Sequence, residues 1–242
     1  MQDRYVGDIG DYVKFSILRV LARSRSLGII WWLFPNENHN HDGGFREYLD
    51  RPMQWRDFDS ELFQILSTLQ KRRELFAIET AGILPAATFF SAQIPCECKP
   101  YSSRPMERCR WFSAALAAVA GCDLVLVDPD NGIATANLKL TSRRAGKSIT
   151  IDELKALVQP GRCVLVYHHQ TRFRGGHQAE MTDLAVRLQH AGIRVSGALR
   201  ASPWSPRLFL VLNGDPDLLS RAATIAERWP GKISWHPASE LL

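Results

Sequence analysis

Three oxygen-bearing side chains follow directly on one strongly apolar run of the sequence. Residues 123–132 read DLVLVDPDNG, so Asp128, Asp130 and Asn131 come after four consecutive apolar residues. A run of β-favouring apolar residues, with no polar residues in alternate positions, is typical of a strand covered on both faces. Pro129 ends strand pairing because it has no N–H to donate. Open α/β sheets bind ligands at the carboxyl ends of such strands. We therefore expect these three residues to be catalytic; the alternative is a solvated Asx turn.

A second polar segment, residues 167–177 (YHHQTRFRGGH), follows the apolar run at 163–166. Imidazoles can transfer protons near neutral pH, and guanidinium groups bind phosphate through paired hydrogen bonds. A single histidine at such a place is more often structural, but three histidines with two arginines indicate a polyanionic substrate. We expect catalytic roles for His168 and His169. The residues expected to bind substrate are Arg172, Arg174 and His177.

Two glycines and two acids lie close together near the start of the sequence, in GDIGDYVK at 7–14. Lys14 is one helical turn after Asp11, so the two side chains can pair at i,i+3. We expect Asp8, Asp11 and Lys14 to help build a cofactor pocket. The alternative is a flexible cap with a surface ion pair, which stabilises a protein little.

The segment PNENHNHDGG at 35–44 is dense in side chains that can ligate a metal. Carboxylate and amide oxygens suit Mg²⁺ or Mn²⁺, whereas imidazole suits Zn²⁺ and other transition metals. We expect Asn36 to contact a cofactor. If the chemistry is metal-dependent hydrolysis, Asp42 would hold the ion together with Asp128 and Asp130. An exposed turn explains the composition equally well.

The elements that must position these residues alternate between helix and strand. The patterns predict strands at residues 27–34, 75–78, 124–128, 163–167, 193–199 and 207–212. They predict helices at 11–24 (capped by Asp11), 59–72, 105–120, 150–158 (capped by Thr150), 178–191 and 216–228. Such alternation indicates an α/β fold with a mostly parallel sheet and helices on both faces. The connection between 199 and 207 is too short for a helical crossover, so the last two strands should pair antiparallel.

Composition limits the class of protein further. The chain has 242 residues, 45% of them hydrophobic, with a net charge of +5, and fits a single α/β domain over 1–242 with an irregular insertion at 80–104. No apolar run is long enough to span a bilayer, and the polar N-terminal segment is no signal peptide. Five cysteines form no disulfide framework, so we expect a cytoplasmic location. The positive charge favours a polyanionic partner such as nucleic acid, RNA or DNA.

Two segments carry a resemblance to the bacterial 23S rRNA adenine-N6 methyltransferases. Residues 7–21, GDIGDYVKFSILRVL, are similar to the Gly-Asn-His-Ala-Asp-Val-Leu-Lys-His segment before that family's first helix, with matches at Gly7, Asp11 and Lys14. Residues 124–132, LVLVDPDNG, are similar to the family's Ile-Asp-Pro-Pro-Tyr motif, with matches at Asp128 and Pro129.

This resemblance implies a Rossmann-like, class I methyltransferase-like fold with a reversed C-terminal hairpin strand. It also implies S-adenosylmethionine as cofactor, a nucleic-acid substrate and a role for Asp128 in accepting hydrogen bonds from the target amine. Asp130 and Asn131 stand where that family has Pro and Tyr, so the aromatic residue that stacks on the target base is replaced.

Three functions are therefore open. The first is an S-adenosylmethionine-dependent N-methyltransferase acting on nucleic acid. The second is a divalent-metal-dependent nuclease or phosphohydrolase on the same fold, using Mg²⁺ or Mn²⁺ and a histidine base. The excess of acids favours this second function, and the lack of a glycine-rich loop after the first strand counts against the first. The third is a non-catalytic nucleic-acid-binding module, which the density of polar groups at one sheet edge disfavours.

Overall fold

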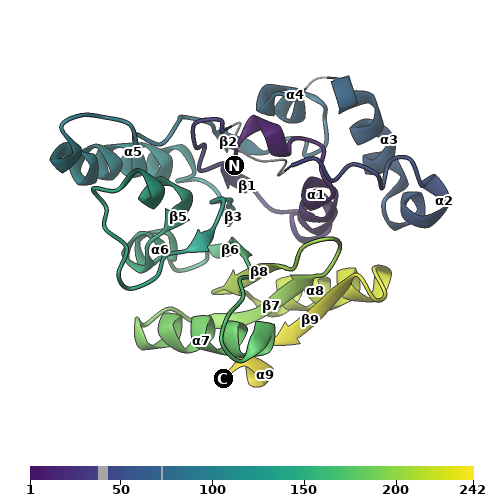
Figure 1. Cartoon of the computed structure of the whole chain (residues 1–242). Coiled ribbons are helices and arrows are strands. Elements are labelled where there is room, and N and C mark those ends of the chain that lie inside the picture. Colours follow the sequence, from purple (N-terminus) through teal and green to yellow (C-terminus); the bar gives the residue numbers. More distant parts are fainter. Residues whose placement is uncertain (38–42, 72) are drawn as a thin grey trace.

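A seven-stranded sheet in the order β2-β1-β3-β6-β8-β7-β9 organises the chain in the computed structural model, which describes residues 1–37, 43–71 and 73–242 (Figure 1). Its strands are β1 (Leu27–Ile30), β2 (Thr88–Phe90), β3 (Leu124–Val127), β6 (Cys163–His169), β7 (Val195–Ala201), β8 (Arg207–Leu212) and β9 (Ile233–Pro237). The short strands β4 (Gly132–Ile133) and β5 (Ser148–Ile149) form a separate pair beside it.

Strand direction divides the sheet into two parts. β2, β1, β3 and β6 are parallel, whereas β8 is antiparallel to both β6 and β7, and β9 is antiparallel to β7. The predicted parallel neighbours β1, β3 and β6 and the predicted antiparallel pair β7 and β8 are thus confirmed. The carboxyl ends of β3 and β6 and the β7–β8 turn consequently meet at one edge of the sheet.

Helices cover both faces of this sheet (Figure 1). They are α1 (Ile9–Leu21), α2 (Pro52–Trp55), α3 (Ser60–Thr68), α4 (Leu75–Thr80), α5 (Arg104–Ala118), α6 (Ile151–Leu157), α7 (Gly176–His190), α8 (Pro216–Arg228) and α9 (Ala238–Leu241). One hydrophobic cluster joins α1, α3, α4 and α8 to the sheet, and a second joins α5, α6 and α7 to the other face. Along β3, Leu126 belongs to the first cluster and Val127 to the second, as the alternation of a strand requires.

Short polar contacts set the helix starts. α1 begins after Asp8, whose side chain accepts a hydrogen bond from the Asp11 N–H, so the prediction that Asp11 caps this helix is wrong. The Asp11 carboxylate instead accepts from the Gly7 N–H at 2.9 Å. The predicted cap of α6 is confirmed, because Thr150 and Glu153 form a reciprocal capping box.

One other prediction fails for an identifiable reason. Residues 75–78 form part of α4 rather than a strand; Leu75 and Ile78 are buried at helical spacing, while Phe76 is 67% exposed. The segment 80–104, which we expected to be irregular, consists mostly of turns and loops but contains the short parallel edge strand β2. The sequence analysis missed β9, although its residues Ile233 to His236 alternate between apolar and polar side chains. Across the described residues, no helix has the length and apolar character needed to cross a membrane.

Candidate functional site

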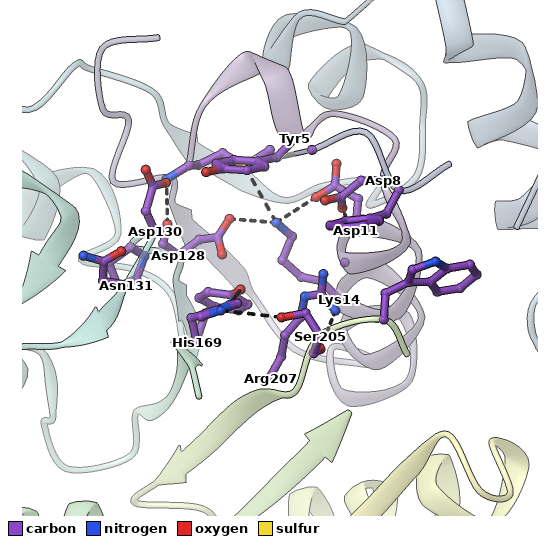
Figure 2. A pocket seen from close by; sticks show the side chains of 17 residues that line it. Tyr5, Asp8, Asp11, Lys14, Asp128, Asp130, Asn131, His169, Ser205 and Arg207 are labelled. Atoms are coloured by element: carbon purple, nitrogen blue, oxygen red, sulfur yellow. Dashed lines mark hydrogen bonds and ion pairs between the residues drawn. The ribbon is translucent and has the colours of Figure 1, made fainter. Parts of the chain in front are cut away.

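A cavity of about 380 Å³ lies at the edge of the sheet where β3 and β6 end (Figure 2). Among the residues that the structure describes, the lining comes from five segments that are far apart in the sequence, within residues 1–14, 43–45, 128–131, 167–169 and 204–207. The N-terminal half of α1 forms one side, and the turn before β8 forms another. The two segments 7–14 and 128–131, which we singled out in the sequence, therefore face the same space.

Lys14 lies between two buried carboxylates. Its Nζ is 2.9 Å from Asp11 Oδ1 and 2.7 Å from Asp128 Oδ2 (Figure 2). All three side chains are at least nine-tenths buried. Burial alone would lower the pKa of Lys14, but the two carboxylates outweigh it and raise the pKa above its usual value. Lys14 is therefore a permanent cation that fixes Asp128, and the predicted pairing of Asp11 with Lys14 is confirmed.

The two acids at the start of α1, Asp8 and Asp11, hold protons unusually tightly. Burial and the nearby charge of Asp11 raise the pKa of Asp8 from 3.8 to about 6, although Arg207 opposes this shift. Burial likewise raises the pKa of Asp11. Asp8 consequently changes its protonation state between pH 5 and pH 7, within reach of physiological pH.

Asp130 is held by the first two residues of the sequence. Its carboxylate is 2.6 Å from the Gln2 Nε2 group and 2.6 Å from the Met1 amino group. The same amino group donates hydrogen bonds to the main-chain oxygens of Trp32 and Asp128. Met1 thus fills the space between the carboxyl ends of β1 and β3. Asn131 is exposed and lines the cavity.

The two adjacent histidines lie on opposite faces of β6. His169 lines the cavity, with Nδ1 3.5 Å from the Tyr167 hydroxyl and Nε2 3.5 Å from Ser205 Oγ. His168 points away from it; its Nδ1 accepts a hydrogen bond from the Ile133 N–H, and Nε2 is 3.5 Å from Glu180. Burial lowers the pKa of His168, so this imidazole is neutral. The geometry makes His169 the better candidate for proton transfer.

The remaining predicted residues lie outside the cavity lining. Arg172 and Arg174 are exposed on the loop before α7, and His177 lies 3.1 Å from the guanidinium of Arg200. Asn36 is exposed and exchanges hydrogen bonds with Asp3. Asp42 lies outside the described residues. In residues 1–37, 43–71 and 73–242, no three Asp, Glu, His or Cys side chains are grouped as metal ligands.

Several lining residues escaped the sequence analysis. Arg207 is buried opposite His169 in the β6–β8 pairing and donates hydrogen bonds to the main-chain oxygens of Pro203 and Ser205. Trp204 belongs to the same turn, and further aromatic lining comes from Tyr5 and Phe45. The short ASPWSPR connection did indicate a turn between two strands. Because β7 runs parallel to β6, the turn that follows β7 lies at the same edge of the sheet as His169.

Comparisons with known proteins add no assignment. No family model, curated protein sequence or solved structure matches this chain.

Proposed function

We propose that the chain is an S-adenosylmethionine-dependent N-methyltransferase acting on nucleic acid. The observation that carries this proposal is the contact between Lys14 Nζ and Asp128 Oδ2 at 2.7 Å. It joins the two segments that resemble the rRNA adenine-N6 methyltransferases, although they are more than a hundred residues apart in the sequence. Residues that match a family motif by chance would have no reason to meet in one cavity.

The sheet agrees with this proposal. β8 runs in the reverse direction between β6 and β7, next to the parallel strands β1, β3 and β6. A parallel sheet with such a reversed strand is the layout expected of a Rossmann-like, class I methyltransferase-like fold. Asp128 follows β3 at the carboxyl edge, where such sheets bind their ligands.

The chemistry of the cavity fits S-adenosylmethionine, a ligand with an amino-acid part, a cationic sulfur and an aromatic base. The volume of about 380 Å³ is within the range of small-molecule sites. Asp8 and Asp11 offer carboxylates to an ammonium group, Arg207 offers a cation to a carboxylate, and Tyr5 and Phe45 offer aromatic surface. When bound, this cofactor supplies an electrophilic methyl group.

The protein's own residues would then orient the target amine and handle its proton. Asp128 accepts hydrogen bonds from the amine and stabilises the positive charge that develops on the nitrogen. Lys14 holds Asp128 in position through their buried ion pair. His169 lines the same cavity and is the group placed to receive the proton that the methylated nitrogen releases.

Calorimetric titration with S-adenosylmethionine, in the absence and presence of EDTA, tests the proposal. We expect micromolar binding that EDTA does not change, together with transfer of labelled methyl from the cofactor to cellular RNA or DNA. Asp128→Asn should lower that transfer by about 100-fold or more while the protein still folds. Nucleic-acid cleavage that requires Mn²⁺ would instead favour the hydrolase alternative. Binding of nucleic acid with neither methyl transfer nor cleavage would favour the non-catalytic binding module.

A further inference from the structure

Trp204 is an exposed aromatic residue in a conformation that bulky side chains avoid. It is 41% exposed, lines the cavity and has a φ of 56°. A left-handed backbone is unfavourable for a residue of this size and persists only where surrounding contacts impose it. Such strain concentrates at ligand-binding positions, so this residue calls for a functional explanation.

Neighbouring groups hold the turn of Trp204 rigidly. Pro203 and Pro206 restrict the backbone on either side, and the Ser205 N–H donates to the Pro203 oxygen at 2.7 Å. The buried Arg207 guanidinium donates to the Pro203 and Ser205 oxygens at 2.9 and 2.7 Å. The backbone of this turn is therefore held in place, and Trp204 lines the cavity from it.

The ring is also supported from behind. Its centroid is 5.3 Å from that of Trp55, with an angle of 36° between the planes. Phe45, which is 37% exposed, adds a second aromatic side chain to the lining. An indole that is backed by another indole and still open to a cavity is a preformed surface for a flat, aromatic ligand.

We propose that Trp204 stacks against the nucleobase whose exocyclic amine is received by Asp128. This inference rests on the proposed function and specifies its substrate as an amino-bearing base in single-stranded or flipped-out nucleic acid. Asn131 stands where the related motif has its stacking aromatic residue, so the DPDN turn lacks this surface. The turn before β8 supplies it to the same cavity. Stacking tolerates different bases, because every base has a π face.

The test measures fluorescence anisotropy of a labelled 12-nucleotide single-stranded oligoadenylate with four proteins: wild type, Trp204→Leu, Trp204→Phe and Phe76→Ala. Trp204→Leu keeps apolar volume without a stacking face, and we expect binding weaker by about 5- to 150-fold. Trp204→Phe should retain most of the affinity. Phe76→Ala is the matched control, because Phe76 is an exposed aromatic residue outside the cavity lining.

A second probe separates base stacking from backbone contacts. An oligomer of the same length with abasic sites should bind wild type as weakly as Trp204→Leu binds oligoadenylate. Equal affinity of wild type and Trp204→Leu for oligoadenylate would overturn the inference, as would the absence of any binding by wild type.

Failure of the stacking role and failure of the proposed methyl transfer give different results. Weak binding by Trp204→Leu with no methyl transfer by any variant would keep the stacking role and reject the methyltransferase. Equal methyl transfer by wild type and Trp204→Leu would instead keep the methyltransferase and reject the stacking role.

Discussion

Lys14 has two buried partners, and its removal would leave both carboxylates without the ammonium group that they share. Breaking a buried pair from one side destabilises a protein by about 3–5 kcal/mol, since the remaining charge stays buried. We therefore expect Lys14→Met to lower the free energy of unfolding by roughly this amount in urea titrations. The contacts of Lys14 with Asp11 and Asp128 are the structural basis of this expectation.

A double-mutant cycle checks that the effect comes from the pair. In an Asp128→Asn background one of the two charges is already gone, so Lys14→Met should cost clearly less than in wild type. An equal cost in both backgrounds would show that Lys14 acts through packing of its aliphatic chain, and the electrostatic account would then be wrong.

Asp8 makes stability depend on pH. Its pKa is about 6 in the folded protein against 3.8 as the usual value, so the folded state binds this proton more tightly than the unfolded chain does. The free energy of unfolding must then fall as pH rises from about 4 to about 6, and the loss is complete above pH 6. Asp8→Asn retains a good helix cap and removes this titration.

We expect Asp8→Asn to show a shallower fall in stability between pH 4 and pH 6 than wild type, measured by urea unfolding at several pH values. Asp11 also has a raised pKa, so part of the slope should remain. Parallel curves for variant and wild type would mean that Asp8 does not titrate in this range.

At the scale of elements, Gly132 shapes the turn that carries the acids. It has a φ of 89°, and a Cβ at this position would lie 2.4 Å from His168 Nδ1. Gly132→Ala must therefore adopt a strained backbone and displace β6, and we expect a loss of at least about 1–3 kcal/mol in unfolding free energy.

Gly121→Ala provides the comparison for this glycine. Gly121 precedes β3, the strand that the turn with the acids follows. Its φ lies outside the left-handed region, and a Cβ there would meet nothing within 4 Å. The unfolding free energy of Gly121→Ala should stay within about 0.5 kcal/mol of wild type. If the two variants were equally stable, the close contact with His168 would not constrain the turn.

Long, regular elements were predictable because their patterns are local. The proline and acid at 215–216 and the following apolar spacing predict α8 at its observed bounds, Pro216–Arg228. The four-residue apolar run of β3 was equally clear. The run at 75–78 was ambiguous, because four apolar residues fit a strand or one helical turn. Only burial of Leu75 and Ile78 in the hydrophobic cluster that also contains residues of α1 and β1 decides between them.

The site was predictable in part for the same reason. Asp8, Asp11, Lys14 and Asp128 follow from glycines, acids and a strand end, which are local signals. Which of His168 and His169 enters the cavity depends on which face of β6 meets α1. The place of Arg207 depends on the position of β8 beside β6. The ASPWSPR segment marks a turn between two strands, but the position of these strands beside β6 has no signature within a short window of sequence.

At the scale of the whole molecule, the net charge of +5 remains consistent with the predicted polyanionic partner. Arg172 and Arg174 are exposed outside the cavity, where they could contact phosphates of a bound strand. We expect the double variant Arg172→Ala, Arg174→Ala to bind oligoadenylate more weakly. The slope of log affinity against log salt concentration should also become shallower by about 1 to 2.

Arg110→Ala/Arg144→Ala removes two other exposed arginines and serves as the control. An unchanged salt slope in the Arg172/Arg174 variant, or an equal reduction in the control, would argue against phosphate contacts at the loop before α7.

The dispersed origin of the cavity lining has a consequence for the order in which this protein matures. Lys14 meets Asp128 only after β1 and β3 are both in the sheet, and Arg207 joins them only when β8 has paired with β6. Contacts between distant segments form late, since long loops must close first. During synthesis from the N-terminus, no ligand could find its complete pocket before residue 207 had left the ribosome. Ligand binding would therefore report on the last steps of folding, and a nascent chain would reach them without help from its own ligand.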